Sequence, residues 1–451
     1  MTVISVDSIR NMPIAASYGP VVVIYFIAFA LMFLLPASLA SAELTSVFPN
    51  GSGIYTWVKE GINKPFGMLA IWLQWAENIF YYPQQLIFIF LILFYVFGQM
   101  TGNPTSLDGD TSSLHIPLVL CGLLLFLVLS WLNGKGLSMS VALSNWMTYL
   151  GLVIPIGILC VIFIYHIITF GGSKLLPIVS PSQWGGWLTH GGLEGLQDKF
   201  DVVLLSYTGV EIATVHTRNV QNPRQSYPRA LLIAALIIML TQAIGSLAIY
   251  LSNHGDMVHG DMKYIVYAFS HFFETLHLTW LTPLISLLIA FGLIGGLSNW
   301  ILAPSRGLKL ALEDQGLLPL LTQDKTEMPR RMLWFQAGLV TALSMYLMLF
   351  QQSYLEVIGL LIQIMAFIYL AMYLLMFVAL ARVCVNGNNH IIPFGRFGVL
   401  LVALSGICVS MAPIVVYLML IQSWYDALFK ALLIMVMFII PLGLSYFKQK
   451  A

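Results

Sequence analysis

The chain has 451 residues, of which 59% are hydrophobic and only 9% are charged, and its mean hydropathy is +0.88. Soluble domains carry roughly 25% charged residues, so a water-soluble fold is excluded. One bilayer crossing takes about 20 apolar residues, which leaves room for roughly eleven or twelve spans and for no sizeable soluble domain. The formal net charge is +1; without a run of like charges, the sequence predicts no nucleic-acid partner.

Apolar runs separated by short polar breaks predict an all-α integral membrane protein that is embedded in the lipid bilayer along its whole length. The predicted helices form two groups of five and a final pair. The first group covers residues 3–16, 20–45, 66–98, 114–132 and 138–170, the second covers 200–215, 228–251, 278–312, 332–350 and 354–383, and the pair covers 394–418 and 427–446.

The distribution of cations gives the orientation. If the first helix starts in the cytoplasm, most lysine and arginine residues fall in cytoplasmic segments, whereas only Lys174, Lys199, Lys263 and Lys430 face the opposite side. Such a bias is typical of multi-pass membrane proteins. It predicts a plasma-membrane location, in bacterial terms the inner membrane.

The first apolar segment is unusual, because residues 1–16 are too short to cross a bilayer. They also contain Asp7, Arg10 and Pro13. A secretory signal peptide has a charged beginning and a small-residue cleavage site, and both are missing here. The segment therefore indicates the second half of a broken helix, whose first, cytoplasmic half is truncated.

The polar run at this first break contains Ser5, Asp7, Ser8 and Arg10, followed by Pro13, which cannot donate a backbone hydrogen bond. An interrupted helix leaves free N–H groups that suit a carboxylate, so these four polar residues are candidates for substrate binding. In the alternative interpretation, Asp7 and Arg10 form a structural ion pair at i,i+3.

A second polar run lies in the predicted sixth span, where Tyr207, Gly209 and Glu211 follow one another at alternate positions. Glycine permits unwinding, and an acid in apolar sequence indicates a functional site. The run takes the same place in the second group of helices as the first run does in the first group, a pattern typical of transporter binding sites. The alternative is a glycine kink beside a neutral, packed glutamic acid.

Five further residues in predicted spans are candidates for the substrate site. Trp300 lies in the eighth span, Tyr369 and Tyr373 stand at i,i+4 in the tenth, and Glu77 and Tyr81 stand at i,i+4 in the third as secondary candidates. Aromatic residues at this spacing also occur in ordinary core packing, which is the competing interpretation.

The sequence contains no HExxH spacing, no Walker-type phosphate loop and no GxSxG turn. The acids in the predicted spans do not stand with the histidine or serine partners that hydrolysis needs. We therefore expect no enzyme activity, no bound metal and no cofactor. The sequence does not indicate the oligomeric state.

Three stretches resemble the amino acid, polyamine and organocation (APC) transporter superfamily, and within it the glutamate/GABA antiporter branch. The first joins Glu43 to a glycine, tyrosine and tryptophan segment, the second is similar to the broken sixth helix of the family and its exit, and the third is close to the eighth-helix signature of the branch. They cover residues 42–58, 207–228 and 299–307.

The resemblance implies a leucine-transporter-type fold with a 5+5 inverted repeat plus two extra helices. Residues 1–170 would form the first repeat, 200–383 the second and 394–446 the additional helices of a single transporter domain. It also implies alternating access around a site between the first, third, sixth, eighth and tenth helices, where Glu211 and Trp300 would lie near an amino-acid substrate.

The predicted function is amino-acid transport by an antiporter that exchanges an external amino acid for an internal one. The sequence does not select the amino acid, and a glutamate/GABA-like pair is one candidate. Two alternatives remain at this stage. One is a cation-coupled amino-acid symporter, and the other is a membrane sensor that binds amino acids without transporting them.

Overall fold

The computed structural model describes residues 9–48, 51, 53–100, 115–135, 146–147, 149–170, 192–212, 223–253, 262–322, 328–350, 354–386, 391–421 and 423–450. All regular structure in these ranges is helical. The helices before residue 212 are α2 Met12–Ala16, α3 Val22–Phe29, α4 Leu35–Val47, α5 Ile54–Gly61, α6 Lys64–Met100, α7 His115–Lys135, α9 Ile154–Phe170 and α12 Gly192–Leu205, and π-helical turns at Ala30–Leu34 and Tyr149–Val153 precede α4 and α9.

The second half of the chain is helical in the same way. Its helices are α13 Pro223–Ser252, α14 Tyr264–Thr275, α15 Leu281–Gln315, α16 Pro319–Thr322, α17 Arg330–Phe350, α18 Tyr354–Asn386, α19 Gly395–Met419, α20 Trp424–Ile434 and α21 Ile440–Lys450, with a π-helical turn at Met435–Ile439 between the last two.

Eight helical stretches in the described ranges are long and apolar enough to cross a membrane. They agree with the predicted all-α membrane architecture. They are Val22–Val47, Lys64–Met100, Tyr149–Thr169, Arg229–Ser252, Leu281–Gln315, Val357–Val383, Gly395–Met419 and Trp424–Lys448.

The helices differ from the sequence prediction in several places. The sixth helix begins at Gly192 rather than at residue 200, and α5, α14 and the four-residue α16 lie in stretches for which no helix was expected. All three are too short to span a bilayer, and α5 and α14 each bury one apolar side against the protein. In α5 the buried side consists of Ile54, Tyr55, Trp57 and Val58.

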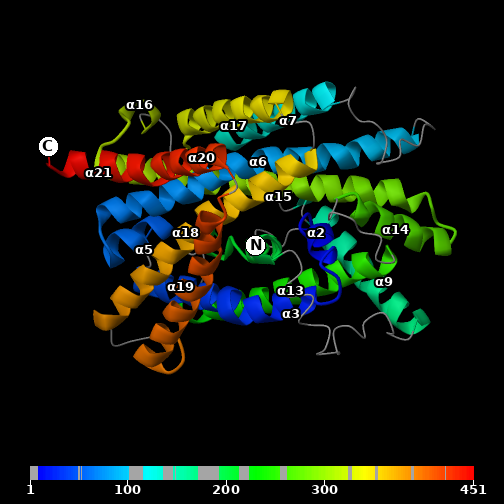
Figure 1. Ribbon diagram of the computed structural model, residues 1–451, viewed down its shortest axis with the longest axis horizontal. Helices are drawn as coiled ribbons and strands as arrows, with labels where there is room; N and C mark the ends of the chain where they lie inside the picture. Colours follow the sequence, from blue (N-terminus) through cyan, green and yellow to red (C-terminus); the bar gives the residue numbers. More distant parts are fainter. Residues whose placement is uncertain are drawn as a thin grey trace.

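Several long helices run roughly along the long axis of the molecule, the horizontal axis of Figure 1, whereas α18 and α19 cross it steeply. There α7 and α17 lie together along one edge, α6 and α15 run side by side through the middle, and α3 and α13 lie along the opposite edge. α18 is the most deeply enclosed spanning helix, since 78% of its most apolar stretch is buried, against 22% for the stretch formed by α20 and α21. The tenth predicted helix is therefore an interior element, whereas α20 and α21 leave most of their surface for lipid.

Two glycines let helices approach closely at the side of this core. Gly151, in the π-helical turn before α9, contacts Gly292 of α15, and a Cβ atom on either residue would collide with the backbone of the other. Small residues that allow such approach are typical of membrane helix crossings.

The acidic residue in the first family-like stretch has a structural contact. The Glu43 carboxylate on α4 accepts hydrogen bonds from the backbone N–H groups of Ile391 (2.8 Å) and Ile392 (3.1 Å). Its side chain is buried, at 2% exposure. Glu43 thus fixes the backbone just before α19 to α4.

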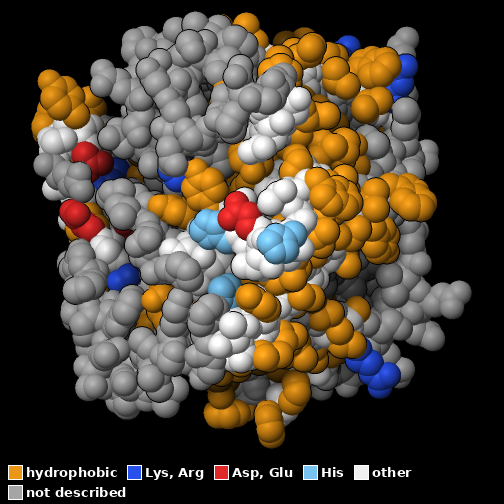
Figure 2. All heavy atoms as spheres, turned by 90° about the vertical axis from the view of Figure 1, so that its right-hand side faces the viewer, with side chains coloured by type: hydrophobic (Ala, Val, Ile, Leu, Met, Phe, Trp, Pro, Cys, Tyr) orange, Lys and Arg blue, Asp and Glu red, His pale blue; other side chains and the backbone are white. Residues whose placement is uncertain are grey.

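Figure 2 shows the end of the molecule at which α6 terminates and α14 lies. Hydrophobic side chains cover much of one flank, as expected for a lipid-facing surface, and histidines surround an acidic side chain near the centre. Two described histidines meet at the end of α13: the His166 ring lies 3.2 Å from Ser252 Oγ, and the His271 ring lies 3.1 Å from the Ser252 carbonyl oxygen.

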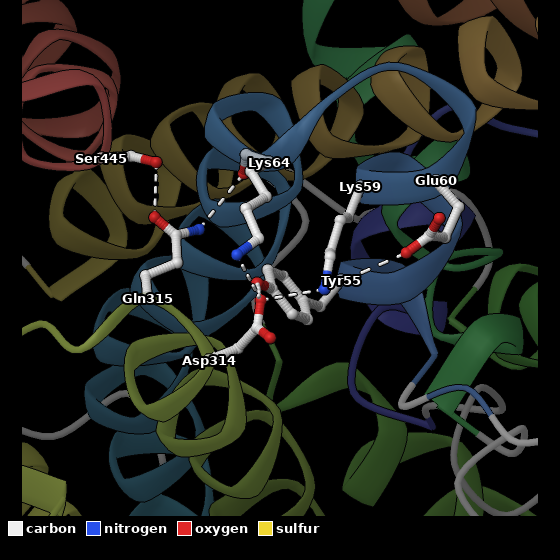
Figure 3. A network of polar contacts seen from close by, with 7 residues as sticks. All are labelled: Tyr55, Lys59, Glu60, Lys64, Asp314, Gln315 and Ser445. Atoms are coloured by element: carbon white, nitrogen blue, oxygen red, sulfur yellow. Dashed lines mark hydrogen bonds and ion pairs between the residues drawn. The ribbon is translucent and has the colours of Figure 1, made fainter. Parts of the chain in front are cut away.

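A polar network joins four helices at the opposite end, which the charge pattern predicts to be cytoplasmic (Figure 3). Asp314 Oδ2 at the end of α15 accepts a hydrogen bond from the Tyr55 hydroxyl (2.6 Å) and lies 2.9 Å from Lys59 Nζ and 3.6 Å from Lys64 Nζ. Burial and the hydrogen bond to Asp314 raise the pKa of Tyr55, so the phenol stays a donor. The adjacent Gln315 extends the network to α21 by accepting a 2.5 Å hydrogen bond from the Ser445 hydroxyl.

We expect Asp314→Asn to lower the free energy of unfolding by about 1 kcal/mol, because it weakens one charge-assisted hydrogen bond and two partly exposed ion pairs. Thermal unfolding in detergent at low and high salt measures this, and the loss should shrink at high salt. Glu60→Gln is the control, since Glu60 is exposed and lies 4.0 Å from Lys59. Equal melting temperatures for the wild type and Asp314→Asn at low salt would contradict the assignment.

Candidate functional site

The sixth membrane helix is broken at the second predicted polar run. α12 ends at Leu205, residues 206–209 are non-helical, and a single 3-10 turn covers residues 210–212. Gly209 has a φ of 100°, which a residue with a side chain rarely adopts. Its N–H donates a 2.9 Å hydrogen bond to the Tyr373 hydroxyl instead of to a helix carbonyl. Gly209 therefore permits the break in the helix, and the hydrogen bond to Tyr373 fixes the broken segment to α18.

Glu211 is the centre of a hydrogen-bond cluster directly after the break. The Tyr369 hydroxyl donates to Oε1 at 2.5 Å, the Tyr373 hydroxyl donates to Oε2, and Gln74 Nε2 donates to Oε1 at 2.8 Å. The side chain is 2% exposed. A buried carboxyl in membrane is costly unless donors surround it, and here α6 and α18 supply three. Glu211 thereby fixes the broken segment to both helices.

A continuous row of aromatic rings leads away from this cluster. The Tyr369 ring lies 6.3 Å from the Trp300 ring of α15, and Trp300 lies 5.5 Å from Tyr81 of α6, measured between centroids. The guanidinium of Arg10 lies over the Tyr81 ring at 4.9 Å from its centroid, a distance typical of a cation–π contact. Residues from three spanning helices and from the segment before α2 thus form one connected group.

Arg10 is buried, at 4% exposure, and makes two hydrogen bonds with amides. Its Nε donates to Asn11 Oδ1 at 3.2 Å, and Nη1 donates to Gln85 Oε1 at 3.0 Å. Asn11 in turn donates to the Ser206 hydroxyl at 3.2 Å, which connects the first broken segment to the second. In the described part of the chain, Arg10 has no ion pair with a carboxylate.

The polar face of α6 borders this group, and much of it was not predicted. Gln84 is fully buried, yet neither its Nε2 nor its Oε1 has a hydrogen-bond partner within the described structure, and the same holds for Glu77 Oε2. The spacing of these residues would have indicated a polar stripe, because they recur every three or four positions on one helix. The stripe consists of Gln74, Glu77, Asn78, Tyr81, Gln84 and Gln85.

Most predicted site residues with described side chains belong to the connected group, but Tyr207 does not. Its hydroxyl donates to the Phe26 carbonyl at 2.8 Å, and its ring packs edge-on against Phe26, so the side chain fastens the break to α3. Three predicted residues of the first break, and with them the suggested Asp7–Arg10 pair, lie outside the described residues; the three are Ser5, Asp7 and Ser8.

The donor atoms of the group suit an organic ion rather than a metal. Amide, hydroxyl and guanidinium groups outnumber carboxylates, and across the ranges that the structure describes no three histidine, cysteine or acidic side chains gather closely enough to hold a metal ion. The arrangement can present a cation, aromatic faces and amides to a small zwitterionic molecule, the combination that orients ligands in mostly apolar sites.

Comparisons with known proteins identify the family. A family model described as amino acid permease matches residues 1–443. An uncharacterized transporter of Legionella pneumophila is 31% identical over 92% of this chain and 87% of its own length. A glutamate/gamma-aminobutyrate antiporter of Lactococcus lactis is 28% identical over 76% of this chain and 66% of its own length.

The fold also resembles a solved structure. The crystal structure of MhsT in complex with L-phenylalanine superposes with a TM-score of 0.62 over 92% of this chain and 96% of that one, at 12% sequence identity. This likeness confirms the predicted all-helical, leucine-transporter-type fold; the division into residues 1–170, 200–383 and 394–446 stays a prediction. From the family model and the transporter relatives, we conclude that this multi-pass membrane protein belongs to the amino acid permease family.

Proposed function

We propose that this protein is a secondary antiporter of the bacterial inner membrane, which exchanges an external amino acid for an internal one by alternating access. The observation that carries the proposal is the group around Glu211, in which a broken helix, two tyrosines of α18 and Trp300 of α15 are linked to Arg10. Substrate sites at discontinuous membrane helices are typical of secondary transporters.

The proposed position of the substrate follows from the charges. A buried arginine is unfavourable unless a carboxylate pairs with it directly. Among the described carboxylates only Glu77 acts on Arg10 electrostatically, and none forms an ion pair with it. We infer that a substrate carboxylate completes this site. Backbone N–H groups around Ser5 to Ser8, where the sequence predicts the first break, would hold the α-carboxylate, and Arg10 would contact a second carboxylate.

The roles of the remaining residues follow from their contacts. Glu211 keeps the break fixed to α18 through Tyr369 and Tyr373, so we assign it a positioning role beside the substrate. Trp300 and Tyr81 would supply the apolar wall against which the substrate carbon chain packs. Glu77, whose Oε2 has no partner within the described structure, would face the substrate ammonium group.

If Arg10 binds a second carboxylate of the substrate, the substrate is an acidic amino acid. The Lactococcus relative is named a glutamate/gamma-aminobutyrate antiporter, and Arg10 would suit glutamate for the same electrostatic reason. We therefore propose glutamate as a substrate and γ-aminobutyrate as a candidate for the exchanged molecule.

The decisive experiment is uptake of labelled L-glutamate into proteoliposomes with and without unlabelled glutamate or γ-aminobutyrate inside. We expect uptake only when the vesicles contain an internal amino acid. Uptake into empty vesicles that follows a sodium or proton gradient would instead establish a symporter. Ligand-induced thermal stabilisation without any flux, across the standard amino acids, would establish a sensor.

A further inference from the structure

An acidic side chain that the proposed substrate site does not use lies in α12. Asp201 is 1% exposed, and its Oδ2 has no hydrogen-bond partner in the described structure. It stands one turn before Leu205, where α12 ends at the break. A buried, half-unsatisfied carboxyl in a transporter helix marks a functional site more often than a packing residue.

The neighbours of Asp201 on α12 do not neutralise it. Gln197, four residues earlier and on the same helix face, hydrogen-bonds to the carboxyl. Asp198, three residues earlier, is an exposed acid, so it brings a second carboxylate rather than a cation to this part of α12. Lys199 is two residues away, and residues at i,i+2 do not face each other on a helix; its charge acts on Asp198.

Among the described residues, the elements packed against α12 also supply no cation that pairs with Asp201. Tyr18, between α2 and α3, and Tyr417 of α19 are the described titratable groups outside α12 that interact with it, and α3 contributes no charged side chain. Lys430 of α20 lies over the Tyr417 ring, 4.6 Å from its centroid, but it is paired with Asp426 at 2.9 Å. The α18 side chain at this face is Gln363, which donates a 3.3 Å hydrogen bond to Asp198 Oδ1 and carries no charge.

The charge state of Asp201 in this conformation follows from these contacts. Burying an ionised carboxylate without a cation and with one bare oxygen costs several kcal/mol. The protonated acid avoids that cost. In water the same side chain is ionised at neutral pH. Burial without a cation therefore favours the neutral acid while α12 is packed as it is here, and contact with water would favour the carboxylate.

We propose that Asp201 is a proton-binding site linked to the position of α12: packing of α12 against α2, α18 and α19 takes up one proton from the outer solution, and outward movement of α12 releases that proton. The reaction is the protonation of a carboxylate to a carboxylic acid, with water as the proton source and acceptor, and it involves no other reactant. This site goes beyond the proposed exchange function, because it makes the packed position of α12 depend on external pH.

Hydrogen–deuterium exchange of the α12 backbone tests the proposal without any substrate. We expect exchange of 192–205 in the lipid-reconstituted protein, corrected for intrinsic rates, to increase from about pH 5 to about pH 8, the range in which a buried acid changes charge. One proton released per opening gives a limiting increase of about tenfold per pH unit.

Two variants remove the acid, and a third is the control. Asp201→Asn and Asp201→Leu should abolish the pH dependence of α12 exchange, and the second variant guards against misfolding of the first. Asp198→Asn, which neutralises the exposed acid one turn away, should keep the wild-type pH dependence. The proposal would be overturned if hydrogen–deuterium exchange of α12 in the wild type did not depend on pH, or if both Asp201 variants kept the wild-type pH dependence.

The outcome is separable from that of the proposed function. A pH-dependent α12 in a protein that shows no amino-acid exchange would support the proton site and overturn the antiporter. Amino-acid exchange in a protein whose α12 is insensitive to pH would support the antiporter and overturn the proton site.

Discussion

Glu211→Gln is expected to reduce amino-acid exchange about 10- to 100-fold while leaving the protein folded. The glutamine side chain has the same shape, but it cannot accept three hydrogen bonds from Tyr369, Tyr373 and Gln74 at once. A hydrogen bond to a charged group contributes about 1.5–3 kcal/mol, and each 1.4 kcal/mol is about tenfold in an equilibrium. The measurement is the initial rate of labelled glutamate exchange at equal protein incorporation.

The matched control for this variant is Tyr207→Phe. Tyr207 lies in the same broken segment, but its hydroxyl contacts the Phe26 carbonyl outside the connected group. Its loss should cost about 1 kcal/mol of stability and leave the exchange rate within a factor of about two. If Tyr207→Phe reduced exchange as much as Glu211→Gln, the segment as a whole would matter and the specific role of Glu211 would be refuted.

Arg10→Gln is expected to raise the KM for glutamate by about 30-fold or more. Removing one partner of a buried charge pair costs about 2–5 kcal/mol, and the proposed partner of Arg10 is the second carboxylate of the substrate. The glutamine amide ends near the position of the arginine Nε, which bonds to Asn11, and loses the longer contact to Gln85; we expect the fold to persist because the substituted side chain remains polar. Kinetics of glutamate uptake over a concentration series measure the change.

Specificity separates recognition by Arg10 from a structural role. Uptake of a neutral amino acid of similar size, such as glutamine, should fall much less than uptake of glutamate. Arg10→Lys keeps the charge without the planar fork, so it should recover part of the glutamate uptake. Equal losses for glutamate and glutamine, with no recovery in Arg10→Lys, would show that Arg10 supports the fold rather than the substrate.

The membrane architecture and the second break could be predicted from the sequence, because their physical signals are local. Long apolar runs require spanning helices, and a glycine beside an acid at membrane depth indicates a break. The positive φ of Gly209 and the burial of Glu211 agree with that interpretation. The i,i+4 spacing of Tyr369 and Tyr373 also allowed both hydroxyls to reach one carboxylate.

Other parts of the site depend on contacts that no local pattern encodes. Gln74 and Gln85 were not predicted, because an amide becomes informative only when its partner is known, and these partners are 137 and 75 residues away. Tyr207 was grouped with Glu211 because it is close in sequence, but an irregular backbone turns its side chain toward α3. Asp201 is similar: its burial depends on α18 and α19, which follow more than a hundred residues later.

The most direct test of the substrate site is an electron cryomicroscopy structure of the lipid-reconstituted protein with L-glutamate bound. We predict density for the amino acid between the two broken helices, with one carboxylate at Arg10 and the carbon chain against Trp300, while Glu211 keeps its contacts with Tyr369 and Tyr373. Glutamate bound elsewhere, with Arg10 and Trp300 not in contact with it, would contradict the account.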